Sequence, residues 1–224
     1  MGGTIACALA GVFPERVQRA VLLEGYSPLF KEPSGAAALL REAIASRKNL
    51  ATKMPRVFAS VEDAVKARME TATRWPGKQS LSVDAARALV ARGTARTGAG
   101  VVFRHDLQLL AREFVFPTAA AVESYIHGIA CDVLIVLARS GGWPYDAATV
   151  SGAAAVVAWP HGRATAAARV QRAMLGHFKR AELHEVDDAS HHLHIDARSA
   201  HRVADLVVPF LRAGEDVPLA GDTK

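Results

Sequence analysis

Short apolar runs that alternate with amphipathic stretches are the feature that most constrains the fold of this chain. Residues 17–25 and 133–138 contain the continuous apolar runs that are typical of buried strands, and residues 181–186 are predicted to form a third strand. Helices are predicted before the first strand, over residues 163–179, and over residues 197–211. Strands that alternate with helices in this way favour an α/β fold, with a parallel sheet and right-handed crossovers.

The first predicted helix is rich in small residues. Gly2, Gly3, Ala6 and Ala10 suit a helix that packs close against a sheet, and the sequence Phe13-Pro14-Glu15 ends it, because proline disfavours helical geometry in the residue before it.

The middle of the chain is predicted to be an insertion into the alternating pattern of strands and helices. Helical spacing of apolar residues predicts helices over 35–49, 61–74 and 83–92, with Ser34, Ser60 and Ser82 as N-caps, and the glycine-rich stretch 93–106 predicts a loop or short hairpin. We therefore expect four regions: a helix and strand (1–25), a helical cap insertion (26–130), the C-terminal half of the core (131–213) and a disordered polar tail (214–224). Residues 151–162 show no pattern that we can assign.

The composition of the chain limits the classes of protein to which it can belong. The chain has 224 residues, half of them hydrophobic, with no apolar run of membrane-spanning length and no secretion leader, so we expect a cytoplasmic protein that does not bind membranes. The formal charge of +5 is scattered, without the basic run that nucleic-acid binding requires. Cys7 and Cys131 lie in apolar contexts, and we expect no disulfide between them. The sequence does not indicate an oligomeric state.

Histidines gather after the third strand. Four occur between His184 and His194, and His191 directly follows a small-residue turn, Ala189-Ser190. Histidine suits a general base because the ordinary imidazole exchanges its proton near neutral pH, whereas His192 and His194 are expected on the way into the last helix. We expect no metal site, because no cysteine or second carboxylate cluster completes a ligand shell.

The start of the chain resembles an α/β-hydrolase just after its nucleophile, and the nearest members are serine hydrolase-like proteins. In that family a Gly-x-Ser-x-Gly turn leads into a helix, and here only the last two positions survive, as Met1 and Gly2. The resemblance implies hydrolysis of an ester or related small-molecule bond without a cofactor, with His191 as the base and the backbone nitrogen of Met1 in the oxyanion hole.

The resemblance also suggests the acid. Many α/β-hydrolases carry it after the strand that corresponds to 133–138, but the sequence there is Ala138-Arg139-Ser140-Gly141. Haloalkane dehalogenases instead place a carboxylate after the strand that follows the elbow helix, where this chain has Glu24. Glu24 to Pro28 also resembles an Asp-Gly-x-x-Pro motif of serine hydrolase-like proteins. Asp146 and Asp106 are the alternatives.

Two segments are expected near the substrate. The stretch Phe103-Arg104-His105-Asp106 resembles a pocket-lining segment of the family, although Arg104 and Asp106 could equally form a local ion pair. Trp143 is expected to close the pocket from the other side, or to belong to the core.

The nucleophile and the strands before it are expected to precede Met1, so the chain as printed is expected to be inactive. Two hypotheses compete: a longer, active hydrolase of which this is a part, and a non-catalytic remnant or binding protein. A haloalkane dehalogenase-like enzyme, with a carboxylate nucleophile, is the alternative enzyme class.

Overall fold

The main sheet consists of three parallel strands, in the order β1-β5-β6. The computed structural model describes residues 1–30, 33–74, 80–111, 113, 116–139 and 173–213. β1 (Arg19–Leu23) pairs with β5 (Asp132–Ala138), which pairs with β6 (Ala181–Val186). The register aligns Leu23 with Val136, and Ala138 with Val186, so all three strands end at the same edge of the sheet. The three predicted strands are therefore present, and the β6 bounds are those predicted.

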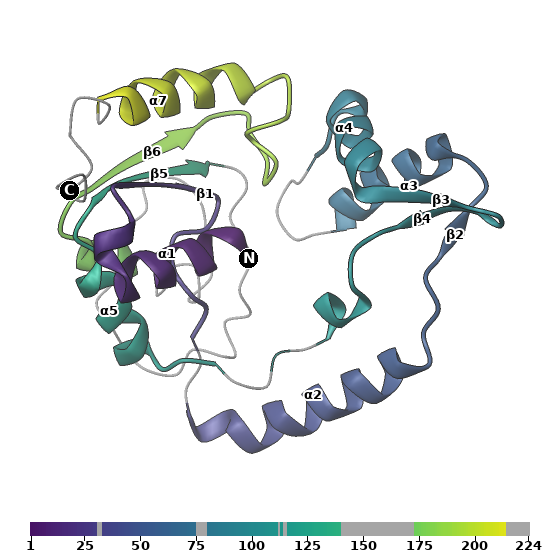
Figure 1. The fold of residues 1–224 in the computed structure, drawn as a ribbon, viewed down its shortest axis with the longest axis horizontal. Helices are drawn as coiled ribbons and strands as arrows, with labels where there is room; N and C mark the ends of the chain where they lie inside the picture. The colour runs from purple at the N-terminus through teal and green to yellow at the C-terminus, as the bar shows by residue number, and fades with distance from the viewer. Residues whose placement is uncertain (31–32, 75–79, 112, 114–115, 140–172, 214–224) are drawn as a thin grey trace, which may run out of the picture.

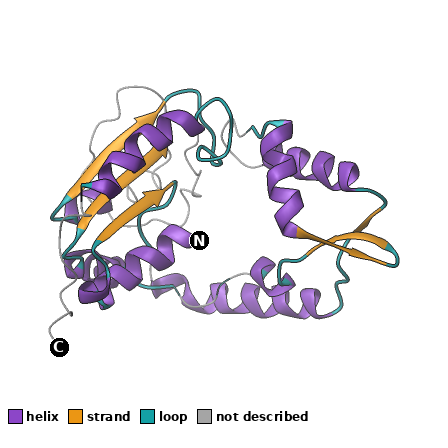
Figure 2. Ribbon diagram, turned by 45° about the horizontal axis from the view of Figure 1, so that its top comes forward, coloured by secondary structure: helices purple, strands orange, loops and turns teal. Residues whose placement is uncertain are grey.

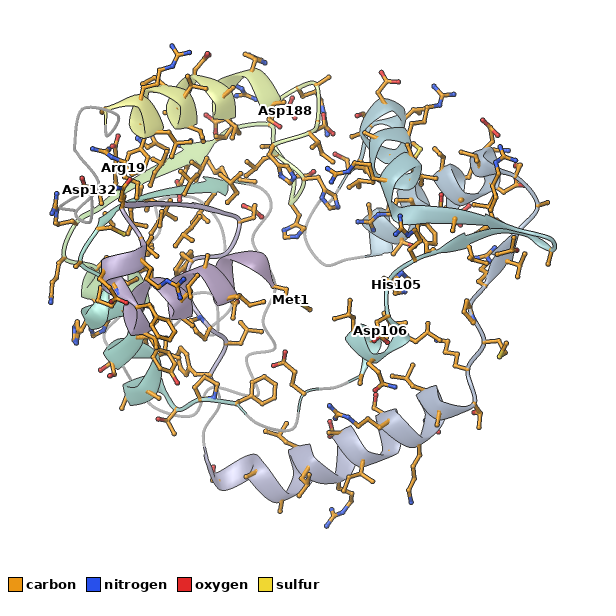
Figure 3. The ribbon with its side chains drawn as sticks, viewed as in Figure 1. Met1, Arg19, His105, Asp106, Asp132 and Asp188 are labelled. Carbon is orange, nitrogen blue, oxygen red and sulfur yellow. The ribbon has the colours of Figure 1, made fainter. Side chains whose placement is uncertain are left out.

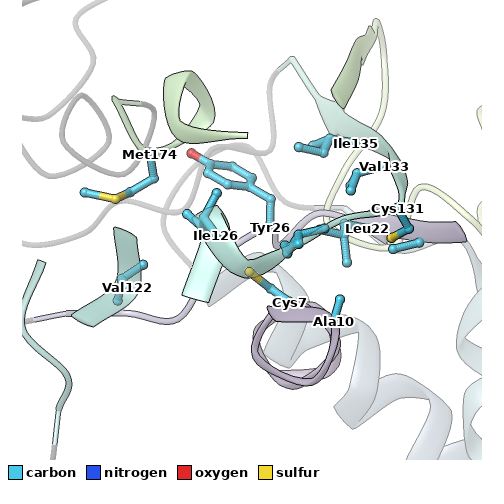
Figure 4. Packing of buried hydrophobic residues seen from close by; sticks show 12 residues of the cluster. Cys7, Ala10, Leu22, Tyr26, Val122, Ile126, Cys131, Val133, Ile135 and Met174 are labelled. Atoms are coloured by element: carbon cyan, nitrogen blue, oxygen red, sulfur yellow. The ribbon is translucent and has the colours of Figure 1, made fainter. Parts of the chain in front are cut away.

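Helices cover both faces of this sheet (Figures 1 and 2). Side chains of β5 alternate between the two faces: Val133 and Ile135 pack with α1 (Gly2–Val12) and α5 (Ala119–Gly128), while Leu134 and Val136 pack with α7 (Ala200–Arg212). This central strand is buried on both sides, which explains why its sequence is a continuous apolar run. Figure 4 shows Cys7 and Ala10 on the side of α1 that faces Leu22.

Glycines allow α1 to approach its neighbours closely, as the small residues predicted. An added Cβ at Gly3 would lie 1.9 Å from the carbonyl oxygen of Gly25, and one at Gly11 would lie 2.0 Å from the carbonyl oxygen of Tyr125. The first contact holds the start of α1 against the end of β1. The second holds its last turn against α5.

The predicted insertion 26–130 contains more than helices. α2 (Ala36–Ala51) is followed by β2 (Val57–Phe58), α3 (Val61–Arg74), α4 (Val83–Gly93), β3 (Thr94–Thr97) and β4 (Gly100–Phe103). The glycine-rich stretch forms the hairpin β3-β4, and β2, which was not predicted, adds to it in an antiparallel sheet of order β2-β4-β3. The elements from β2 to β4 share a second hydrophobic cluster and are called the α3/α4 unit.

α5 packs with the main sheet, although the prediction placed it inside the insertion. Val122, Ile126 and Ile129 belong to the same buried cluster as Cys7 and Leu22. The described chain thus returns to the core at α5, before residue 130.

Several predicted boundaries are shifted for local reasons. Ser60 and Ser82 accept hydrogen bonds from the backbone nitrogens of Asp63 and Ala85, as N-caps do, but α2 begins after a 3₁₀ turn at Pro33–Gly35 and Ser34 does not cap it. The last helix begins at Ala200 rather than residue 197, because residues 196–199 form turns around Asp196.

The helix predicted over 163–179 lies largely outside the described residues. Its described end is a 3₁₀ turn at Met174–His177, and Phe178 is extended. The stretch 151–162 and the predicted tail 214–224 also lie outside them. Among the described residues, no helix combines the length and the apolar character that a membrane crossing requires.

Candidate active site

Glu24 is the first residue after β1, and its backbone is unusual. Its φ of 54° lies in the left-handed region, which residues other than glycine seldom adopt. Its N–H donates to the carbonyl oxygen of Val136, and its Oε1 accepts from the N–H of Ala138, both on the neighbouring strand β5. The side chain is 5% exposed. Backbone and carboxylate are therefore both held by β5, and the carboxylate reaches across the end of that strand.

His191 lies on the loop that follows β6, residues 187–199, here called the His191 loop. Its Nδ1 is 3.4 Å from Oε2 of Glu24, and its side chain is 38% exposed. The structure thus brings together the two residues predicted as acid and base, from opposite edges of the described sheet. The distance is longer than an ordinary hydrogen bond, and such contacts are often long without a bound substrate. Their catalytic roles stay predictions.

The start of α1 lies beside the residues that follow Glu24. Gly3 is in close contact with Gly25, and the hydroxyl of Thr4 donates to the carbonyl oxygen of Ser27 at 3.3 Å. Figure 3 shows Met1 at this end of α1, with Arg19 and Asp132, at the starts of β1 and β5, at the far end of the sheet. The first turn of α1 leaves backbone N–H groups without helical partners, the kind of donor that an oxyanion hole uses. The role predicted for Met1 remains a prediction.

His192 differs from its neighbour in environment. Its Nε2 lies 3.0 Å from Nη2 of Arg68 on α3, so the ring accepts this hydrogen bond and carries its proton on Nδ1. Burial, and next the charge of Arg68, lower the pKa of His192 to about 4. The imidazole is therefore neutral at pH 7. The rings of His191 and His192 are 5.2 Å apart.

A fully buried carboxylate ties the His191 loop to the α3/α4 unit. Asp196, 1% exposed, accepts from the backbone N–H of Ser82, from the backbone N–H of Arg198 and from the Arg198 guanidinium. These bonds hold its pKa below the ordinary value for aspartate. Arg198 also donates to the hydroxyl of Ser80, and Ser190 donates to the carbonyl oxygen of Ser80. We call these five residues the Asp196 bridge.

Sequence reasoning did not find the Asp196 bridge or the Arg68 contact. Ser82 was predicted only as a helix cap, and Asp196 and Arg198 lie in a polar stretch like many surface loops. The available signal was weak: an acid and an arginine two positions apart, directly before a helix.

The residues predicted to line the pocket lie at the end of β4, on the segment that follows it, or outside the described residues. Phe103 packs edge-on against Phe58 in the second hydrophobic cluster, with ring centroids 5.6 Å apart. Asp106 accepts from the N–H of Gln108. Arg104 and Asp106 are both described residues, and no ion pair joins them. Figure 3 shows His105 and Asp106 on the segment that follows β4. Trp143 and the alternative acid Asp146 lie outside the described residues.

The two cysteines are buried, free thiols, as predicted. Burial raises the pKa of Cys7 to about 12 and raises that of Cys131 as well. Neither thiol is therefore activated as a nucleophile. Within the described residues, no group of three or more His, Cys, Asp or Glu side chains could hold a metal ion.

Comparison with known proteins finds relatives by structure. The sequence matches no protein-family model and no curated protein. A hypothetical protein from Pseudomonas aeruginosa PAO1 superposes with a TM-score of 0.72 and 28% identity, covering 94% of this chain and 64% of that one. The thioesterase domain from the curacin biosynthetic pathway gives 0.62 and 16% identity, covering 92% and 63%. A peroxisomal α/β-hydrolase from Saccharomyces cerevisiae gives 0.55 and 13% identity, covering 98% and 52%.

These and other structural neighbours include esterases and further hydrolases. The chain spans less than two thirds of the length of each of the three structures described above. At identities of 16% and 13%, the thioesterase and α/β-hydrolase matches show that this chain shares their fold, and they show no more than that.

Proposed function

The chain has part of the α/β-hydrolase fold, and on that premise we propose that it belongs to a hydrolase that cleaves an ester or related small-molecule bond. His191 is the general base, Glu24 is the acid that orients it, and the serine nucleophile directly precedes Met1 in a longer chain. The observation that carries this proposal is the 3.4 Å separation between Nδ1 of His191 and Oε2 of Glu24.

Glu24 has the properties that an orienting acid needs. It is buried, its Oε1 is held by the Ala138 N–H, and its Oε2 remains directed at the imidazole. An acceptor at Nδ1 keeps the Nδ1–H tautomer of His191, which leaves Nε2 free of a proton and able to take one from a serine hydroxyl. The same carboxylate stabilises the imidazolium that forms in the reaction.

The start of α1 supports the proposed place of the nucleophile. In the α/β-hydrolase fold the serine stands on the turn into this helix, and the N–H of the next residue donates to the oxyanion. Here the first turn of α1 touches Gly25 and Ser27, which follow Glu24 in sequence. A serine at the position before Met1 would therefore lie at the edge of the sheet that carries Glu24 and His191.

The test compares residues 1–224 with the same protein extended upstream by its own reading frame, using a p-nitrophenyl ester. We expect no His191-dependent hydrolysis from residues 1–224. The extended protein is expected to be active, with losses of about 10⁶-fold in kcat for His191→Ala and about 10⁴-fold for Glu24→Gln. Glu24→Gln preserves an oxygen for the Ala138 N–H but presents an amide to His191.

His184→Ala is the matched control, because His184 lies on β6 and contacts Glu182 rather than Glu24. It should retain full activity. Activity of the extended protein that survives His191→Ala, or an upstream frame without a serine at this position, would overturn the proposal. An aspartate there would instead indicate dehalogenase-like chemistry.

A further inference from the structure

Arg68 is a half-buried cation beside the candidate active site. It lies on α3, and its Nη2 contacts Nε2 of the neutral His192 at 3.0 Å. No carboxylate of the described residues forms an ion pair with it. A guanidinium has five N–H donors, and this one uses a single described bond to a side chain without charge. Burial also lowers the pKa of Arg68, which indicates that its charge is poorly compensated.

An acid close to His192 is already engaged in other hydrogen bonds. Asp196 lies close enough to His192 to affect its pKa, but its carboxylate accepts from Ser82 and from the guanidinium of Arg198. Asp196 therefore belongs to the bridge and leaves the Arg68 charge to another partner. A charged group removed from water is stable when it is paired, and the planar guanidinium matches a carboxylate through two parallel hydrogen bonds.

The position of Arg68 relates it to the reaction centre. Arg68 contacts His192, and the ring of His192 is 5.2 Å from that of His191. The Asp196 bridge connects the His191 loop with Ser80 and Ser82, at the start of α4, which packs with α3 in one hydrophobic cluster. Arg68 is thus held at a short distance from the candidate base rather than on a free surface.

We propose that Arg68 binds a carboxylate of the substrate, so that this hydrolase acts on small esters that carry a free carboxylate group. The inference deepens the proposed function and rests on it, because the bound ester is a substrate only if the protein is a hydrolase. Binding of the carboxylate itself can be measured without turnover. His192 supports Arg68 from the side as a neutral acceptor and adds no charge that would compete for the anion.

The experiment uses residues 1–224 and two related probes, monomethyl succinate and dimethyl succinate, followed by the NMR signals of the histidine rings. The monoester should shift the His192 and His191 signals in a saturable way, and the neutral diester should not. Arg68→Met should weaken monoester binding by about tenfold or more, since charge-assisted hydrogen bonds of this kind are lost. Arg68→Lys, which keeps the charge but not the planar fork, should weaken it less.

Arg87→Met is the matched control. It removes an arginine from α4 in the same unit, but Arg87 is exposed and faces Asp84. It should leave binding unchanged. Equal binding of both probes, or equal losses in Arg87→Met and Arg68→Met, would overturn the proposal. If Arg68→Met does not fold, Arg68→Lys decides: binding unchanged from the wild type would refute bidentate recognition.

The extended protein separates this inference from the proposed function. Hydrolysis that requires His191 but shows no preference for the monoester would refute the role of Arg68 alone. Binding of the monoester that depends on Arg68, in an extended protein that hydrolyses neither ester, would refute the hydrolase alone.

Discussion

Replacing Asp196 with alanine should destabilise this protein strongly, because its buried carboxylate accepts hydrogen bonds from two backbone N–H groups and from a guanidinium. The change leaves the N–H groups of Ser82 and Arg198 without their acceptor and removes the ion pair to the Arg198 guanidinium. Breaking a buried pair from one side costs about 3–5 kcal/mol. Arg198 is 43% exposed, so water reaches its guanidinium and the lower end of that range applies. We expect a loss of about 3 kcal/mol.

The assay is urea or thermal unfolding of residues 1–224 at pH 7, followed by circular dichroism. For a chain of this size a loss of about 3 kcal/mol corresponds to a fall in Tm of roughly 10 °C. Asp84→Ala provides the control: this aspartate lies on α4, its side chain is 89% exposed, and it faces Arg87. Its removal should cost below about 1 kcal/mol. Losses that agree within about 0.5 kcal/mol for the two variants would refute the reasoning.

The remaining predictions concern close packing and titration. Gly3→Ala should destabilise the protein by more than about 2 kcal/mol, since its Cβ would meet the Gly25 carbonyl, whereas Gly2→Ala, with nothing within 4 Å, should be nearly neutral; chemical denaturation compares them. The folded pKa of His192, about 4, lies below the unfolded value near 6.5, so the unfolded chain binds the extra proton between these values. Stability should therefore rise with pH from about 4 to 6.5, by up to about 3 kcal/mol, and His192→Gln should flatten this rise in unfolding curves measured across that range. Arg68→Met should raise the pKa of His192 in an NMR titration but leave it below 6.5, because burial is its larger cause; an unchanged pKa would show that the two side chains do not interact.

Local sequence patterns were sufficient for the elements that depend on local forces. The strand at Ala181–Val186 and the helix at Val61–Arg74 have the predicted bounds, because alternation, helical spacing and serine caps act within a few residues. The short strand β2 was missed, since two residues carry no period and Val57–Phe58 becomes a strand only by pairing with β4.

The candidate pair could be named from the sequence only through a family resemblance. What the sequence by itself determined was that Glu24 and His191 each follow a strand. Their approach to 3.4 Å depends on the strand order β1-β5-β6, which places both strand ends at one edge and lets Glu24 reach across the end of β5.

The tertiary structure alone decided what surrounds this pair. Arg68 and His192 are 124 positions apart, and Ser82 and Asp196 are 114 apart, so no local pattern relates them. Hydrogen bonds and buried charges depend on which surfaces the folded chain brings together, and a polar residue in a loop looks the same in the sequence whether it faces water or a buried cation. Local periodicity thus determined the strands and helices, and packing determined which of their side chains share a site.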